Sequence, residues 1–278
     1  ELNNPRAQNS LGFLYLHGFG VEKNLNKALQ YYEMSAKQND SNALKNLGSM
    51  YENGLGVVKD ILRAIKYYES SAKQKNSGAY LNLGLLYIKG VGVEKNYTKA
   101  IEYLKLSAEQ KNSCAFYILG YLYLFGFEVK KDFSKAKYYL EESSKLYDSL
   151  AFLSLSELYL NGIGVEKDYF KAKDYCELSA KEYNPEAFFQ LSKYFIDSDI
   201  FGIDYARSIQ YLLKSIALHE KKLIVNNHFG GTELIFIYNK YFYHANNDLG
   251  LIYLTVFEDL EKGVEYIKKA AFGEYPFA

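Results

Sequence analysis

The sequence predicts an all-α fold, a solenoid in which antiparallel helix pairs stack into one continuous domain. Two observations support this prediction. The dipeptide Leu-Gly recurs at a fixed interval of 36 residues, beginning at Leu11, Leu47, Leu83 and Leu119. After each recurrence, a hinge that contains glycine leads into a second helical pattern. An interval of this length is typical of repeats whose helix pairs bury their apolar faces only against neighbouring pairs.

The first helix of each repeat is predicted from the spacing of its apolar and small residues. In the first repeat these residues are Ala7, Leu11, Gly12 and Tyr15, and similar residues follow at the same positions in later repeats. Spacings of three and four residues place side chains on one face of a helix. A glycine inside a helix costs about 1 kcal/mol relative to alanine. Its recurrence therefore predicts that a neighbouring helix approaches closely at this point.

The hinge between the two helices contains a pair of glycines in most repeats, as in Gly18-Phe-Gly20. One glycine is expected to end the first helix in the left-handed conformation, and the other allows the chain to reverse. The fourth hinge reads Gly126-Phe-Glu128 and the sixth reads Ser198-Asp-Ile200. These two hinges are therefore predicted to be strained or reshaped.

The second helix of each repeat begins at an asparagine or aspartate, whose side chain can accept a hydrogen bond from a free amide of the first turn. These N-cap residues are Asn24, Asp60, Asn96, Asp132, Asp168 and Asp204. A tyrosine recurs further along the helix, and we predict that it packs in the solenoid core. The tyrosines at this position are Tyr31, Tyr67, Tyr103, Tyr139, Tyr175 and Tyr211.

The repeat boundaries predict three segments. Residues 1–218 are expected to form six helix pairs of 36 residues each. Residues 219–244 are expected to be an insertion, with an irregular loop over 219–231 and an extra helix from Glu233 to Tyr243. Residues 245–278 resume the pattern at Leu249-Gly250 and are predicted to form a diverged C-terminal capping repeat.

Composition excludes several classes of protein. The chain has 33 basic and 33 acidic residues and a net charge of zero, which argues against a surface for nucleic acid. No apolar run approaches the roughly 20 residues of a membrane span. Because the chain begins at Glu1 rather than methionine, we expect a processed or excised fragment, upstream of which a signal peptide could have stood. Cys114 and Cys176 fall on helices about 8–10 Å apart, too far for a disulfide, so no bridge is expected.

The sequence lacks the common motifs of catalysis, metal binding and nucleotide binding, including H-E-x-x-H, G-x-S-x-G and the P-loop. The histidines have no metal-ligand spacing. We therefore expect no catalytic residue, no metal site, no cofactor and no enzymatic activity. The alternative is a hydrolase acting on cell-wall or small-molecule substrates, which a deep pocket with converging charged groups would favour.

The repeated unit resembles the Sel-one-like repeat (SLR), a relative of the tetratricopeptide repeat (TPR). The unit reads A-x-x-x-L-G-x-x-Y-x-x-G-x-G-V-x-x-D/N-x-x-K-A-x-x-Y, and it covers residues 5–217 and, more weakly, 245–271. The resemblance implies a right-handed superhelix and a scaffold or adaptor that binds proteins or peptides without catalysis. Bacterial members are often exported, envelope-associated or used by pathogens against host cells. We therefore expect a periplasmic, outer-envelope or secreted bacterial factor with a possible role in virulence, and the oligomeric state stays open.

The resemblance also implies that the first helix of each pair lines a concave face. On that face, repeats three to five carry an unusual number of apolar residues, which is typical of an interface. We predict a groove for an apolar peptide or helix, centred on Tyr117 and Tyr121. Its residues are Leu81, Leu85, Ile88, Tyr117, Tyr121, Leu124, Leu153 and Leu160. The alternative is that these side chains bury against each other or under the inserted helix.

Overall fold

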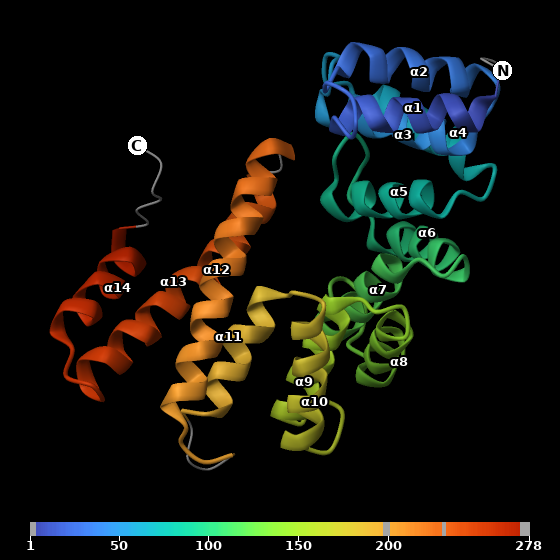
Figure 1. Ribbon diagram of the computed structural model, residues 1–278. Helices are drawn as coiled ribbons and strands as arrows, with labels where there is room; N and C mark the ends of the chain where they lie inside the picture. Colours follow the sequence, from blue (N-terminus) through green and yellow to red (C-terminus); the bar gives the residue numbers. More distant parts are fainter. Residues whose placement is uncertain (1–3, 197–200, 230–231, 273–278) are drawn as a thin grey trace. The chain divides into compact units, whose positions relative to one another are not determined.

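The protein is helical throughout the part of the chain that the structure describes. A computed structural model describes residues 4–196, 201–229 and 232–272, with side chains described outside 220–241 and 272. These residues form fourteen α-helices and no strand (Figure 1). The predicted all-α class is therefore confirmed.

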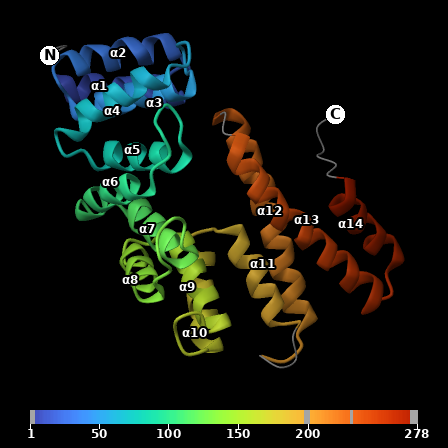
Figure 2. The same ribbon diagram turned by 180° about the vertical axis from the view of Figure 1, so that it is seen from behind.

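The helices form antiparallel pairs, each consisting of a first helix (helix A) and a second (helix B). They group into two compact units, residues 1–146 and 147–278, where the sequence predicted one continuous domain. Within each unit a helix pair packs against the next pair (Figures 1 and 2). The first unit contains α1 (Pro5–His17), α2 (Leu25–Lys37), α3 (Ser41–Asn53), α4 (Ile61–Ala72), α5 (Ser77–Lys89), α6 (Tyr97–Glu109), α7 (Ser113–Phe125) and α8 (Phe133–Ser144). The second unit contains α9 (Ser149–Asn161), α10 (Tyr169–Lys181), α11 (Pro185–Tyr194), α12 (Tyr205–Phe229), α13 (Thr232–Thr255) and α14 (Leu260–Phe272).

The glycine of each Leu-Gly dipeptide lies against a bulky side chain of helix B. A Cβ atom added to Gly12 would lie 2.6 Å from Cδ1 of Tyr32, and one on Gly48 would lie 2.5 Å from Cε1 of Tyr68. Cβ atoms do not approach other heavy atoms this closely in proteins. The close approach predicted from the recurring glycine is therefore confirmed.

The buried residue of helix B is the one that follows the recurring tyrosine. The residues at this position have no exposed surface, and they are Tyr32, Tyr68, Leu104, Leu140, Cys176 and Leu212. The recurring tyrosines themselves are only half-buried. Our prediction therefore placed the core position one residue too early. The error is about 100° around the helix, because an α-helix has 3.6 residues per turn.

The recurring tyrosine of helix B stacks instead on the aromatic ring of helix A in the same pair. The ring centroids of Tyr15 and Tyr31 lie 5.6 Å apart with an interplanar angle of 5°. Equivalent pairs lie 5.6–5.9 Å apart, and they are Tyr51–Tyr67, Tyr87–Tyr103, Tyr123–Tyr139, Tyr159–Tyr175, Phe195–Tyr211 and Tyr253–Tyr266. The recurring lysine or arginine covers the ring of helix A, as Arg63 does at 4.2 Å from the centroid of Tyr51. Such cation–π contacts contribute about 0.5–1 kcal/mol at exposed sites.

A serine in the last turn of helix B ties each pair together at its other end. Ser71 Oγ donates a 2.7 Å hydrogen bond to the carbonyl oxygen of Ser41, the first residue of α3. The same bond recurs at 2.6–2.9 Å from Ser35, Ser107, Ser143, Ser179 and Ser215. These serines are fully buried, so the hydrogen bond satisfies a hydroxyl that water cannot reach.

The hinge of the fourth repeat has a backbone conformation similar to that of the first, second, third and fifth repeats. Gly18, Gly54, Gly90, Gly126 and Gly162 end their helices in the left-handed region, as predicted. Glu128 has a φ of 51°, close to the 68° of Gly56 at the same position, so the hinge is strained by a side chain rather than reshaped. Residues 198–200 of the sixth hinge lie outside the described residues.

The C-terminal segment differs from the prediction of a loop followed by a short helix. Helix α12 continues without interruption to Phe229, and α13 is one helix from Thr232 to Thr255. The loop prediction is wrong for residues 219–229, where no glycine or proline interrupts the sequence. The second half of α13 supplies helix A of the last pair, because a Cβ on Gly250 would lie 2.8 Å from Cγ1 of Ile267 in α14.

Candidate partner-binding surface

The predicted groove residues divide between the two units. Leu81, Leu85, Ile88, Tyr117 and Leu124 are half-buried on helices α5 and α7 of the first unit, and Tyr121 on α7 is 39% exposed. Leu153 and Leu160 belong to the second unit. The predicted groove residues therefore fall into two sets, one in each unit.

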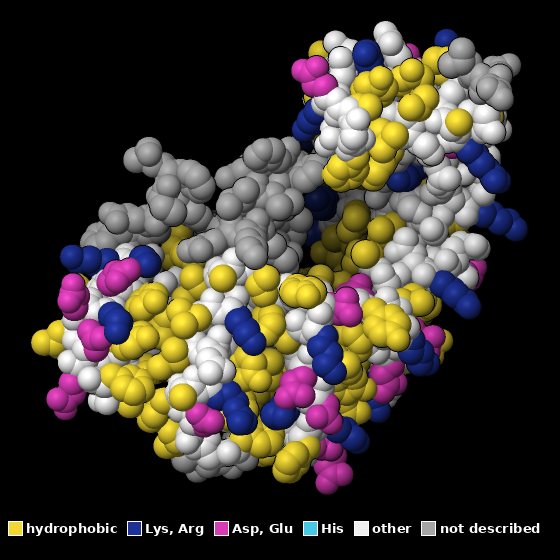
Figure 3. All heavy atoms as spheres, viewed as in Figure 1, with side chains coloured by type: hydrophobic (Ala, Val, Ile, Leu, Met, Phe, Trp, Pro, Cys, Tyr) yellow, Lys and Arg dark blue, Asp and Glu magenta, His cyan; other side chains and the backbone are white. Residues whose placement is uncertain are grey.

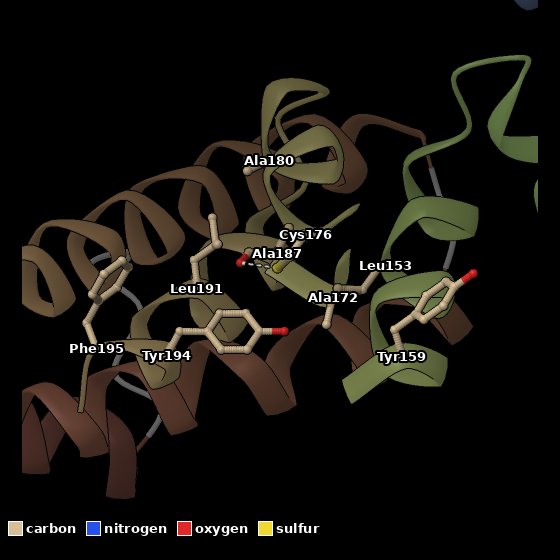
Figure 4. Close-up of a cluster of buried hydrophobic side chains, with 9 residues drawn as sticks. All are labelled: Leu153, Tyr159, Ala172, Cys176, Ala180, Ala187, Leu191, Tyr194 and Phe195. Atoms are coloured by element: carbon tan, nitrogen blue, oxygen red, sulfur yellow. Dashed lines mark hydrogen bonds between the residues drawn. The ribbon is translucent and has the colours of Figure 1, made fainter. Parts of the chain in front are cut away.

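Leu153 is a core residue rather than a surface residue. It is only 7% exposed and belongs to the buried cluster around Cys176 and Tyr194, against which Leu160 also packs (Figure 4). Its inclusion among the accessible groove residues is therefore wrong, because α10 and α11 cover it. The same cluster buries Cys176, whose Sγ donates to the carbonyl oxygen of Ala187 at 3.3 Å, and this burial raises the pKa of the thiol. Cys114 and Cys176 are not joined by a disulfide.

An exposed group of aromatic rings lies at the hinge end of α7, and we call Tyr121, Phe125 and Phe127 the hinge aromatic cluster. The centroid of Tyr121 lies 4.5 Å from that of Phe125 and 5.9 Å from that of Phe127. These three rings are 39%, 47% and 40% exposed. Phe127 also stacks on the buried ring of Tyr97, with an interplanar angle of 10°. The cluster is therefore held from below while its outer surface stays open to solvent.

The sequence analysis missed Phe125 and Phe127, although a signal for them was present. The position of Phe127 is aliphatic in the second, third and fifth repeats, where Leu55, Val91 and Ile163 occupy it. A phenylalanine in the hinge, six residues beyond Tyr121, departs from this aliphatic pattern. The glycines of the hinge predict only its backbone conformation, so the exposure of the Phe127 side chain did not follow from them.

The first repeat carries aromatic rings at the same three positions. Phe13, His17 and Phe19 correspond to Tyr121, Phe125 and Phe127, with ring centroids 4.4–5.9 Å apart. Phe13 is 45% exposed and Phe19 is 54% exposed. Burial, together with the nearby charge of Lys23, lowers the pKa of His17. The A-helix face of the first unit therefore has aromatic rings in its first and fourth repeats.

The second repeat is polar on the same face. The hydroxyl of Tyr68 reaches through the helix layer and donates a 2.6 Å hydrogen bond to Glu52 Oε2. Burial and the neighbouring carboxylate raise the pKa of Tyr68. Asn46 donates to Asn9 at 2.9 Å, and Asn76 donates to Asn42 at the same distance. These bonds join the A helices of neighbouring repeats.

Lys45 lies on this polar part of the face. Its side chain is half-buried, and its Cδ and Cε atoms lie 3.6 and 3.7 Å from where a Cβ of Gly78 would stand. Burial lowers the pKa of Lys45. The ammonium group makes no hydrogen bond or ion pair with another described residue.

The cavities of the described residues include a few charged side chains in their lining, among them Lys59, Asp60 and Arg63 in the first unit and Lys193 and Asp248 in the second. One cavity in the second unit has a volume of about 440 Å³ and a mainly aliphatic lining with Lys193 and Asp248. Among the described residues, no three His, Cys, Asp or Glu side chains lie close enough together to hold a metal ion.

On the face that Figure 3 shows, charges of both signs alternate with apolar side chains. Within the described ranges, none of the helices combines the length and apolar character that a membrane crossing requires.

Comparison with protein families finds the Sel1 repeat at residues 5–40, 41–76, 77–112, 117–148, 148–184 and 244–271. A Sel1 repeat protein from Oxalobacter formigenes has a similar structure, with 31% identity, a TM-score of 0.74, and coverage of 77% of this chain and 88% of that one. The protein c5321, a protective antigen present in uropathogenic Escherichia coli strains, is 26% identical, with a TM-score of 0.67. That alignment covers 96% of this chain and 61% of the other. The immunity protein Pa5087 from Pseudomonas aeruginosa shares the fold at 22% identity and a TM-score of 0.54, over 77% of this chain and 81% of that one. No curated protein matches the sequence significantly.

Proposed function

Because the chain belongs to the Sel1 repeat family, whose fold is generally a scaffold for protein–protein interaction, we propose that it binds a protein segment along the A-helix face of its first unit. The proposed role is that of an adaptor without catalytic activity. The groove would use Leu81, Leu85 and Ile88 on α5 and the hinge aromatic cluster on α7.

The exposure of the hinge aromatic cluster carries this proposal. Three adjacent rings that are 39–47% exposed are unfavourable in water, because each Å² of apolar surface costs about 25 cal/mol. Aromatic side chains are enriched among the residues that dominate binding energy at interfaces. The contact of Phe127 with Tyr97 holds the rings in place before a partner arrives, which reduces the entropy cost of binding.

We further propose that the protein acts in the bacterial envelope or after secretion, and that it takes part in contact with a host. The similarity to a chain described as a protective antigen of uropathogenic Escherichia coli supports this part of the proposal. Fractionation of the producing cells tests it directly. Recovery of the protein only with cytoplasmic markers would contradict it.

Site-specific photo-crosslinking in the producing cells tests the binding surface. A benzophenone amino acid at Tyr121 is expected to form an adduct of defined mass with one protein. The matched control carries the same group at Tyr138, a 54% exposed ring on helix B of the same repeat, and is expected to lack that adduct. Identical adducts from both positions would contradict the proposed groove.

Substitution of the central ring provides a second test. Tyr121→Glu is expected to leave the helix content unchanged, because the ring is exposed, and to abolish partner capture, because a carboxylate would be buried in the interface. Circular dichroism checks the helix content. Tyr138→Glu is the control, and undiminished capture by Tyr121→Glu would exclude the cluster as the binding site.

A further inference from the structure

The A-helix face of the first unit changes character from one repeat to the next. Lys45 in the second repeat, Leu81 in the third and Tyr117 in the fourth occupy the same repeat position. One helical turn further on, the corresponding residues are Ser49, Leu85 and Tyr121. The surface therefore runs from a cation through aliphatic side chains to aromatic rings.

Among the residues that the structure describes, Lys45 has no acidic partner on this face. Glu52 lies seven residues further along α3, about 10 Å along the axis, and side chains on a helix lean toward its N-terminus. Lys45 therefore points away from Glu52, whose carboxylate already accepts a hydrogen bond from Tyr68. The N-cap carboxylate of Asp40 is likewise engaged, because it accepts a hydrogen bond from the amide of Ala43.

The position of Lys45 restricts where its charge can find a partner. Its aliphatic stem packs over Gly78, and the half-buried ammonium has lost part of its hydration. A cation that is partly removed from water without a counter-charge is unfavourable. The lowered pKa of Lys45 is consistent with this unpaired state. A carboxylate placed on this face would supply the missing charge.

We propose that the segment bound by the first unit carries an acidic side chain that pairs with Lys45, together with a bulky apolar side chain that contacts the hinge aromatic cluster. This inference rests on the proposed function and specifies the chemistry of the partner. Lys45 and Tyr117 are two repeats apart, which corresponds to about 20 Å for helices about 10 Å in diameter. An extended chain covers this distance in about six residues. The partner segment is therefore acidic at one end and apolar at the other.

Selection from a random dodecapeptide library, displayed on phage without a free C-terminus, tests the inference on the full chain. The expected outcome is enrichment of peptides in which Asp or Glu stands about six residues from Phe, Tyr, Trp or Leu. Selection on the variant Lys45→Met, which keeps the apolar stem, is expected to lose the acidic preference and keep the apolar one. Lys66→Met is the charge-matched control, because Lys66 is an exposed residue on α4, helix B of the same repeat. This variant should select the same peptides as the unaltered chain.

A synthetic peptide from the selection gives the quantitative test by calorimetry. Replacement of its acidic residue by the amide is expected to weaken binding about tenfold to the unaltered chain, because a charge-assisted hydrogen bond is lost. The same replacement should have no effect on binding to Lys45→Met. Increased salt should weaken the acidic peptide more than its amide analogue.

The outcomes distinguish this inference from the proposed function. The acidic peptide and its amide analogue could bind the unaltered chain equally well and both fail to bind the Tyr121→Ala variant. That result would overturn the role of Lys45 and leave the proposed groove intact. Failure of the library to enrich any peptide, or binding unaffected by Tyr121→Ala, would overturn both.

Discussion

The hydroxyl of Tyr68 donates a 2.6 Å hydrogen bond to the carboxylate of Glu52. One repeat earlier, Tyr32 occupies the same buried position, but Leu16 stands where Glu52 would be. The hydroxyl of Tyr32 is buried and has no hydrogen-bond partner among the described residues. Two buried tyrosines at the same repeat position therefore differ in whether the hydroxyl group has a hydrogen-bond partner.

This difference predicts opposite effects of the same substitution. Tyr68→Phe is expected to lower the free energy of unfolding by about 1.5–3 kcal/mol, because a hydrogen bond to a charged group is lost. Tyr32→Phe is expected to leave the stability unchanged or raise it by about 1 kcal/mol, because an unsatisfied buried hydroxyl is removed. Urea denaturation of both variants measures the effects. Equal destabilisation would contradict the assigned hydrogen-bond pattern.

The buried tyrosines also predict a loss of stability at alkaline pH. Burial raises the pKa of Tyr32 and of Tyr194 to about 12, from the ordinary value of 10. Above pH 10 the unfolded chain releases these protons while the folded chain still holds them, so the folded state is disfavoured as pH rises. Each such group is expected to lower the free energy of unfolding by about 1.4 kcal/mol per pH unit between pH 10 and 12.

Denaturation midpoints measured from pH 8 to pH 11.5 check this expectation. Stability should begin to fall above about pH 9, where the Cys176 thiol ionises in the unfolded chain but stays protonated in the folded one, and should fall more steeply above the pKa of free tyrosine. Tyr32→Phe should reduce the slope, because one of the shifted groups is gone. An unchanged slope in this variant would show that Tyr32 ionises alike in both states.

The glycines of the first unit predict a contrast between two helix positions. Gly48→Ala is expected to destabilise the protein by about 1–3 kcal/mol, because the added methyl would lie 2.5 Å from the ring of Tyr68. Gly78→Ala is the matched control on α5, where the nearest atom, Asn76 Oδ1, lies at 3.4 Å. This control is expected to be stabilising by about 0.5–1 kcal/mol, since alanine favours helix over glycine. Thermal unfolding of the two variants distinguishes the cases, and stabilisation by Gly48→Ala would refute the close approach.

The fifth repeat replaces this glycine by Ser156 and pairs it with the small side chain of Cys176. Ser156 Oγ donates to the carbonyl oxygen of Ala172 at 2.7 Å and lies 3.4 Å from the hydroxyl of Tyr194. Cys176→Leu alone is expected to destabilise the protein by about 1–3 kcal/mol by overpacking. The double variant Cys176→Leu with Ser156→Gly would reproduce in the fifth repeat the glycine–leucine contact that Gly120 and Leu140 make in the fourth. It should therefore recover part of the lost stability. A double-mutant cycle with a coupling energy below about 0.5 kcal/mol would show that the two positions are independent.

The period of 36 residues, the N-cap that begins each helix B and the need for a close approach at Gly12 and Gly48 could all be predicted from the sequence. These features depend on local spacing, capping and the cost of a helical glycine, which are properties of short segments. The chain beyond Ala217 was harder to predict, because helix α12 continues through a polar stretch where no residue type forces a stop.

The exposure of the residues on the candidate surface, by contrast, could not be predicted from the sequence. The sequence placed Tyr121 on the A-helix face, but only packing between helices decided that Leu153 is buried and that Phe125 and Phe127 are exposed beside Tyr121. Among the described residues, the same packing left the Lys45 ammonium group without an ion pair and gave the Tyr68 hydroxyl an acceptor that the Tyr32 hydroxyl lacks. A residue's repeat position determines which way it points from its helix. Its burial depends on the side chains of other repeats, which the spacing within one repeat does not specify.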